Sequence, residues 1–238
     1  MKKYIIYFKG IKFYNYPPSY LIKKITNEGG YLVAPAASSL ATISKNRFYY
    51  QALRLSNIAI LDSGFFCFLL RVFKQLKPKK LSGYLFLKKF ISTHYVKNKK
   101  ILLINPTSQE EKKNMKILKK NNFKKIYNYI APEYFTNMAI IDVKLLNLIN
   151  KIKPKFVLIN IGGEKQELLA EYIYKKSNCR KMAVLCLGAA IAFLTKSQAP
   201  ITARIDRYYL GWLARLWFNP KVYSPRLVKS VFLVRLFL

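Results

Sequence analysis

One acidic residue stands alone in a long basic and apolar part of the sequence. Asp62 directly follows the apolar run Ile58 to Leu61, and it is the only acid between positions 28 and 110. A carboxylate that leaves the end of a buried strand, beside the small pair Ser63-Gly64, is well placed to act as a general base. The alternative is that Asp62 only caps the next helix, as short polar residues do routinely.

A second candidate site is the glycine pair Gly162-Gly163, which lies between a predicted buried strand and a predicted helix. Glycines at such a junction let the backbone approach a ligand closely, and the start of the helix presents N–H groups to a diphosphate. The run from Gly163 to Glu167 matches neither a P-loop nor a dinucleotide-binding fingerprint. Taken alone, these residues favour a plain turn over a nucleotide diphosphate site.

Metal-ligand and hydrolase patterns are missing from the sequence. It contains no D-x-D pair, and its single histidine, His94, belongs to no spaced cluster of ligands. The three cysteines form no C-x-x-C pair, and no histidine is placed to activate Ser63 or Ser82. We therefore expect no metal, no cofactor and no disulfide bond.

The elements that position these residues follow from short apolar runs with β-prone composition. Such runs predict buried strands at Tyr31 to Ala34, Ile58 to Leu61, Ile101 to Ile104, Ile126 to Ile130, Phe156 to Ile161 and Met182 to Leu187. Helical spacing between them predicts helices at Ser39 to Leu55, Phe65 to Leu76, Gln109 to Asn121, Ile140 to Ile152 and Lys165 to Lys176. This alternation predicts an α/β fold with a Rossmann-like, mostly parallel sheet and helices on both faces. Ligands of such sheets bind at the carboxyl ends of the strands, where Asp62 and the glycine pair lie.

Composition limits the classes of protein and partner. The 238 residues are 52% hydrophobic, which argues against intrinsic disorder, and 43 Lys and Arg against 10 Asp and Glu give a net charge of +33. That charge favours an anionic partner: nucleic acid, anionic lipid or a phosphorylated substrate. The longest charge-free apolar run is shorter than the roughly 18 residues of a spanning helix. Lys9 and Gly10 interrupt a signal-like start, so we expect an unprocessed, cytosolic chain.

The segment from Lys196 onward has a different composition. It holds both tryptophans, and eight basic residues there accompany a single acid, Asp206. A helix over Ile201 to Phe218 would be amphipathic, and a stripe of this kind is more typical of a helix that faces a core than of one that binds a membrane. We expect residues 1–195 to form the core and residues 196–238 a basic, aromatic, helical appendage.

In order and spacing, these motifs resemble the bacterial WecG/TagA/CpsF glycosyltransferases, also called glycosyltransferase family 26. That family carries an acid-glycine loop, a G-x-P-K-Q-E loop, a G-a-a-h-x-F pattern, Ala-Pro, a G-L-E-W-x-x-R-L pattern and N/E-P. The counterparts here are Asp62-Ser63-Gly64, Gly163 to Glu167, Gly188 to Phe193, Ala199-Pro200, Leu210 to Leu216 and Asn219-Pro220. The similarity runs from about Tyr31 to the end.

The resemblance implies a metal-independent, inverting glycosyltransferase. It would move a sugar, N-acetylmannosamine-like or a related hexose, from a UDP-sugar to a polyprenyl-diphosphate-linked acceptor in the synthesis of cell-surface polysaccharide or teichoic acid. Asp62 falls at the family's proposed base, Gln166 matches a glutamine of its pocket, and Lys80 stands where the family usually has an arginine near the substrate.

Chemistry adds roles for the neighbouring residues. Backbone N–H groups after Gly162 and Gly163, with Lys80 or Lys165, would stabilise the leaving diphosphate, and Glu167 completes this substrate-binding loop. In the C-terminal segment, basic side chains would meet lipid phosphates at the inner face of the cell membrane while a tryptophan sits at the headgroup level. The residues expected to do so are Arg204, Arg207, Arg215 and Trp212.

The sequence also departs from the family pattern. The family's early T-x-N is Ala34-Pro35-Ala36 here, and an acid expected near Ile191 is missing. The donor sugar therefore stays open, and a member that has lost transferase activity is an alternative. A non-catalytic nucleic-acid-binding protein is another alternative, but its signatures are missing, so we expect no nucleic acid partner. The oligomeric state, including a homo-oligomer, also stays open.

Overall fold

The structure, a computed structural model, describes residues 4–188, 190–195, 217 and 219–238. Its single described sheet has eight strands in the order β1-β2-β4-β3-β8-β7-β5-β6. β1 is antiparallel to β2, and the other neighbouring pairs are parallel. The strands are β1 (Ile5–Phe8), β2 (Ile11–Tyr14), β3 (Gly30–Val33), β4 (Ile58–Ile60), β5 (Lys100–Asn105), β6 (Lys125–Ile130), β7 (Phe156–Ile159) and β8 (Ala183–Cys186).

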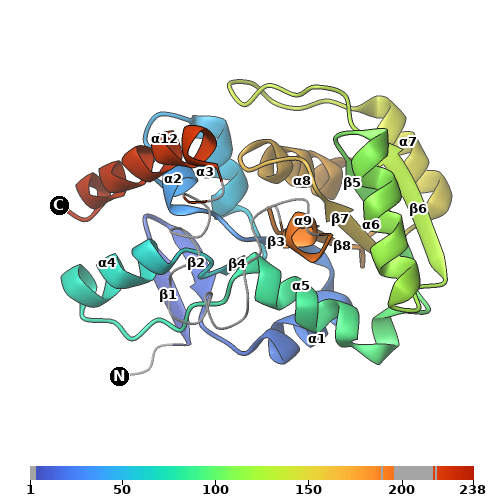
Figure 1. The fold of residues 1–238 in the computed structure, drawn as a ribbon, viewed down its shortest axis with the longest axis horizontal. Coiled ribbons are helices and arrows are strands. Elements are labelled where there is room, and N and C mark those ends of the chain that lie inside the picture. The colour runs from blue at the N-terminus through green and yellow to red at the C-terminus, as the bar shows by residue number, and fades with distance from the viewer. Residues whose placement is uncertain (1–3, 189, 196–216, 218) are drawn as a thin grey trace.

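Helices cover both faces of this sheet (Figure 1). One face packs against α2 (Ala37–Leu40), α3 (Arg47–Arg54), α4 (Gly64–Lys74), α7 (Val143–Ile152), α8 (Lys165–Lys176) and the short 3-10 helix η2 (Phe232–Leu236). The other packs against α1 (Pro18–Glu28), α5 (Gly83–Ser92), α6 (Ser108–Lys120) and α9 (Ala190–Leu194). The remaining elements are η1 (His94–Val96) and α12 (Pro220–Val231). The predicted α/β class with a mostly parallel sheet is confirmed.

Burial on both faces explains why the central strands are mostly continuous apolar runs. In β5, Leu102 and Ile104 belong to the core on one side of the sheet. Ile101 and Leu103 belong to the core on the other side. A parallel strand covered by helices on both faces therefore has no position that favours a polar residue, and its sequence becomes a continuous apolar run.

The interruption at Lys9 and Gly10 is the turn of a β-hairpin. Both residues have positive φ angles, 46° and 74°, as a tight two-residue hairpin turn requires. The turn joins β1 to β2, and β2 pairs with β4, so the hairpin extends the parallel sheet at one edge. Sequence reasoning did not predict these two strands, nor helices α1 and α5.

The predicted continuous helix from Ser39 to Leu55 is wrong. The chain forms α2 and α3 there, separated by a turn. Asn46 explains the break, because its side chain accepts a hydrogen bond of 3.0 Å from the N–H of Tyr49 and caps the start of α3. Because the apolar spacing continues across the turn between α2 and α3, that spacing does not reveal the turn.

The C-terminal segment joins the core on the α4 side of the sheet. Leu233 and Phe237 are buried there, and the Phe237 ring lies 4.6 Å from that of Phe8, between centroids. α12 packs against α2. The predicted helix from Ile201 to Phe218 lies outside the described residues, apart from Trp217. In the described part of the chain, no helix has both the length and the apolar character to span a membrane.

Candidate active site

The loops that follow four neighbouring strands meet at one edge of the sheet. β4, β3, β8 and β7 are adjacent and parallel, so their carboxyl ends lie side by side. With strands about 4.8 Å apart, the Asp62 loop after β4 and the glycine loop after β7 are separated by about 14 Å. The chain leaves β3 toward α2 on one face and β8 toward α9 on the other. Diverging connections of this kind open a ligand crevice between the strands.

Asp62 is anchored to the start of a helix. Its Oδ1 accepts a hydrogen bond of 2.7 Å from the N–H of Gly83, the first residue of α5. The cap of α4 is Ser63 instead, whose hydroxyl accepts from the N–H of Phe66 at 3.2 Å. The alternative that Asp62 merely caps the next helix is therefore wrong. The helix dipole of α5 and this bond hold a half-buried carboxylate in a fixed orientation.

Lys80 lies close to Asp62. The N–H of Leu81 donates to the carbonyl of Leu61 at 3.0 Å, which aligns the segment before α5 with the end of β4. Both charged groups act on the thiol of Cys67: burial raises its pKa to about 12, Lys80 lowers the pKa and Asp62 raises it. The structure therefore brings together two of the residues predicted for the site, a carboxylate and an ammonium group.

The glycine loop turns sharply before α8. Gly162 has a φ of 25°, and a Cβ added there would have nothing within 4 Å, so the backbone angle rather than crowding favours glycine. A Cβ on Gly163 would lie 3.4 Å from the Ser39 hydroxyl. The side chain of the N-cap residue, Glu164, leaves α8 uncapped, although the Glu167 carboxylate accepts from the backbone N–H of Glu164. An uncapped helix start at this edge of the sheet suits an anion.

The two charged residues that open α8 have partners in other parts of the fold. Lys165 Nζ lies 3.9 Å from the carboxylate of Glu133, and both side chains are exposed. Glu164 is mostly buried, with Thr42 Oγ1 at 3.3 Å and Lys229 Nζ at 3.6 Å. Lys229 belongs to α12, so the C-terminal helix contacts the glycine loop directly.

Gln166 and Glu167 connect two loops of the site from inside the protein. Gln166 Oε1 accepts from the N–H of Gly188 at 3.1 Å, and its Nε2 donates to Glu167 Oε1 at 2.9 Å. Both side chains are 1% exposed. Burial raises the pKa of Glu167 to about 7, against the hydrogen bond from Gln166. Glu167 Oε2 has no hydrogen-bond partner among the described residues.

Comparison with known families identifies the chain. The model of the glycosyl transferase WecG/TagA/CpsF family matches residues 6–238, nearly the full length. The chain belongs to this family. The protein is therefore a glycosyltransferase by family, which requires a sugar donor and an acceptor. No curated protein matches the chain.

Three polar residues of this WecG/TagA/CpsF site were missed by sequence reasoning. Ser39 and Thr42 follow the Ala34-Pro35-Ala36 loop and place their hydroxyl groups beside the glycine loop. Tyr49 is fully buried, and burial raises its pKa well above the usual value, with Glu167 and Glu164 adding to the effect and the nearby Ser39 side chain opposing it. The available signal was the Ser38-Ser39 pair, which lies in α2, the short helix after the loop at the carboxyl end of β3, because residues near such ends often contact ligands.

Four predicted site residues, Arg204, Arg207, Arg215 and Trp212, lie outside the described residues. In the ranges that the structure describes, no three His, Cys, Asp or Glu residues gather as a metal site would require. The described part of the site thus consists of Asp62 and Lys80 on one side and the start of α8 on the other.

Proposed function

We propose that this WecG/TagA/CpsF protein transfers a hexose, N-acetylmannosamine-like or related, from a UDP-sugar to a polyprenyl-diphosphate-linked acceptor, with inversion and without a metal. The observation that carries this proposal is the shared edge of the sheet: the anchored carboxylate of Asp62 and the uncapped start of α8 flank the ends of β3 and β8. A sugar nucleotide laid across those two strands reaches both groups.

The transfer is a single displacement in which each group has one task. The acceptor hydroxyl attacks the anomeric carbon, Asp62 takes the hydroxyl proton, and the bond from that carbon to the diphosphate breaks. The configuration inverts because attack and departure occur on opposite faces of the sugar. A positioned base of this kind contributes about 10²–10⁴-fold.

The leaving UDP carries the negative charge that develops in the reaction. Backbone N–H groups of Gly163 and Lys165 at the start of α8 are fixed dipoles that stabilise charge without rearranging. Lys80 adds a positive charge on the Asp62 side of the site, and Lys165 adds one at the loop. These groups supply what a divalent cation supplies in metal-dependent transferases, so we expect turnover to be insensitive to a chelator.

Gln166 and Glu167 serve the donor site by holding its loops in place. Because the amide of Gln166 bonds to Gly188 and to Glu167, it keeps the β7 and β8 loops at a fixed separation. We assign both residues to positioning of the donor diphosphate. The rigid pair leaves the backbone of Gly162 and Gly163 to approach the phosphates.

The acceptor is a lipid, so the protein must work at a membrane. We propose that residues 196–238 dock on the cytoplasmic face of an anionic bilayer, with Arg204, Arg207 and Arg215 near lipid phosphates and Trp212 at the headgroup level. Each basic residue at such a surface contributes on the order of 1 kcal/mol. This reaction belongs to the assembly of a cell-surface polysaccharide or teichoic acid.

Calorimetric titration tests the donor site. The wild-type protein is titrated with UDP, ADP and a single-stranded RNA at physiological salt, with and without EDTA. We expect UDP to bind with and without EDTA. We expect Gly163→Val to weaken UDP binding, because the valine side chain keeps the loop backbone away from the diphosphate. Gly163→Ala, whose Cβ stays in ordinary contact with Ser39, is the matched control. Binding of RNA with no binding of UDP would replace the transferase by the nucleic-acid alternative.

A further inference from the structure

Helix α4 presents large apolar side chains to solvent. Its inner side is buried through Phe66, Leu69 and Leu70. Its outer side carries Phe68 and Val72, which are 56% and 55% exposed, and it ends near Phe73, which is 40% exposed. Phe68 also stacks on Phe65. A helix that only covers a core has polar residues on its outer face, so this apolar face indicates an unfilled contact.

The C-terminal segment extends this apolar area. The ring of Phe73 lies 5.6 Å from that of Phe237, which joins α4 to the residues that follow α12. Val231 and Phe232 in that segment are 58% and 46% exposed. Figure 1 shows α4 and α12 at the same end of the molecule. We call the exposed apolar side chains at this end the α4 face: Phe68, Val72, Phe73, Val231 and Phe232.

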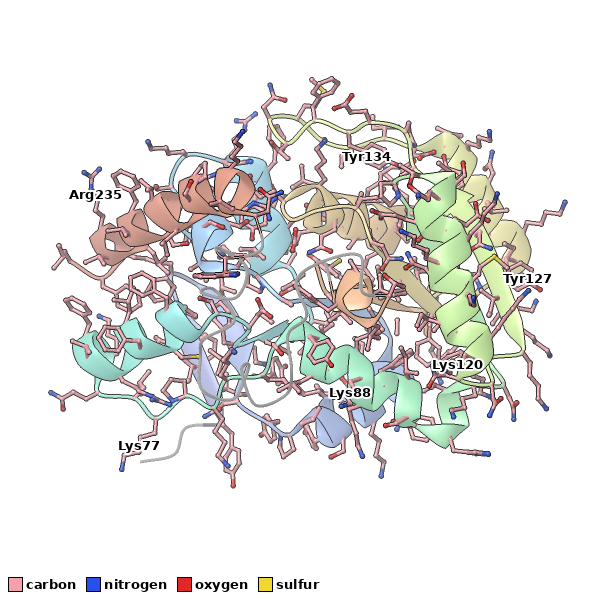
Figure 2. The ribbon with its side chains drawn as sticks, viewed as in Figure 1. Lys77, Lys88, Lys120, Tyr127, Tyr134 and Arg235 are labelled. Carbon is pink, nitrogen blue, oxygen red and sulfur yellow. The ribbon has the colours of Figure 1, made fainter. Side chains whose placement is uncertain are left out.

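Positive charge surrounds the α4 face. Residues 63–80 and 219–238 contain no aspartate or glutamate. Apart from Lys80 beside Asp62 and Lys229, which pairs with Glu164, their basic residues are Arg71, Lys74, Lys77, Lys79, Lys221, Arg226 and Arg235. Figure 2 shows Lys77 and Arg235 projecting at this end, and Arg235 lies 4.8 Å from the centre of the Phe232 ring. Apolar side chains in a cationic rim match the surface of a bilayer that contains anionic lipids.

Two other occupants fit this surface less well. A second copy would bring two cationic rims together, because a symmetric interface places the same patch on both subunits. A nucleic acid would meet the charge but not the aliphatic side chains of Val72 and Val231, on which bases do not stack. Charge complementarity therefore selects the anionic bilayer.

We propose that the α4 face is a membrane-docking surface, in which Phe68, Val72 and Phe73 of α4 act together with the C-terminal segment. The inference rests on the proposed function for its purpose, which is to reach a lipid-linked acceptor. α4 has 11 residues and begins two positions after Asp62, so a docked α4 holds Asp62 no more than about 16 Å along the helix from inserted side chains. The acceptor hydroxyl then meets the base while its lipid tail stays in the bilayer.

Vesicle co-sedimentation tests the proposal with the full chain. Phosphatidylcholine vesicles with and without phosphatidylglycerol are mixed with the wild type and with Phe68→Glu/Val72→Glu. The control is Ile141→Glu/Val143→Glu, which changes two exposed apolar residues and the net charge by the same amount. We expect the α4 variant to lose at least about tenfold in binding to the anionic vesicles, and the control to lose far less. Phe68→Gln/Val72→Gln, checked by circular dichroism, repeats the test without added charge.

Each other result overturns the proposal. An equal loss of vesicle binding in the α4 variant and the control would mean that net charge alone determines binding. Absence of vesicle binding by the wild type would mean that the membrane is not the partner of the α4 face. A wild-type dimer in light scattering that the α4 variant converts to a monomer, with vesicle binding unchanged, would identify a second copy as the occupant. UDP titration is run on the wild type and on every variant. Absence of UDP binding by the wild type would contradict the proposed function, whereas the vesicle result would still test the α4 face.

Discussion

Asp62 anchors the start of α5 and is proposed to take the acceptor proton, and substitution by asparagine distinguishes these two roles. An asparagine side chain still offers an oxygen to the N–H of Gly83, but it cannot take a proton from the acceptor. We predict that Asp62→Asn keeps the melting temperature and the UDP affinity of the wild type and lowers kcat by about 10²-fold or more. Steady-state kinetics and thermal melting measure both. Unchanged kcat in this variant would reduce Asp62 to an anchor for α5.

Glu167 makes the stability of the protein depend on pH. Its pKa is raised from 4.5 to about 7 by burial, so the folded state binds the proton more tightly than the unfolded state. The resulting stability is fully present below pH 4.5 and is lost as the pH rises through about 7. At about 1.4 kcal/mol for each pKa unit, the loss amounts to about 3 kcal/mol.

Urea denaturation across this pH range checks the effect. Glu167→Gln keeps an acceptor for the amide of Gln166 and has no proton to lose. We predict that the free energy of unfolding of Glu167→Gln, relative to that of the wild type, increases as the pH rises from 4.5 to above 7. Glu133→Gln, at an exposed carboxylate, is the control. Parallel pH curves for the wild type and Glu167→Gln would contradict the prediction.

At the scale of the elements, the start of α5 packs tightly against the end of the β8 strand and the loop that follows it. A Cβ on Gly83 would lie 2.6 Å from the carbonyl oxygen of Leu187, which is backbone and cannot swing aside. We predict that Gly83→Ala separates α5 from the β8 loop and lowers the free energy of unfolding by about 1–3 kcal/mol. It also displaces the N–H that holds Asp62, so turnover falls as well. Gly163→Ala, with its roomier environment, should change stability little when both are compared by denaturation.

The sequence predicts an element when the residues within that element carry the pattern that forms it. Six of the eight described strands were predictable, most of them because burial on two faces makes the strand a continuous apolar run, and the edge strand β6 because its residues are β-prone. The β1–β2 hairpin was missed because Lys9 and Gly10 resemble an interruption until their backbone angles are known. Helix α5 was missed although its buried residues Phe86, Leu87, Phe90 and Ile91 recur at helical spacing. The break before α3 depends on one side chain, Asn46.

The same distinction applies to the candidate site. The order of strands and loops was enough to predict that Asp62 and Gly162 share one edge of the sheet. The contacts of Glu164 with Thr42 and Lys229 were not predictable, because the partners are 122 and 65 positions away in the sequence. Nor does the spacing of Gln166 and Glu167 reveal that both side chains face inward, since neighbouring residues on a helix usually point apart.

At the scale of the whole molecule, the last described residues of the chain pack into the core. Phe237 is buried against Phe8 and Phe66, with ring centroids 4.6 and 6.1 Å away. We predict that Phe237→Ala lowers the free energy of unfolding by about 3–5 kcal/mol. Calorimetry should show a single transition that moves to lower temperature. A separate low-temperature transition, with the main one unmoved, would mean that the segment after residue 219 folds independently.

The contact between Phe8 and Phe237 also has a consequence for biosynthesis. The two rings meet although 229 positions separate them in the chain. On the ribosome, the hairpin that carries Phe8 emerges early, and α4 can cover part of its apolar side through Phe66, but the part that Phe237 covers stays exposed until η2 has been translated. Closure over such a sequence distance is slow, and exposed apolar surface during the delay favours aggregation. Until the end of synthesis, the surface that awaits Phe237 is therefore open to binding by a chaperone.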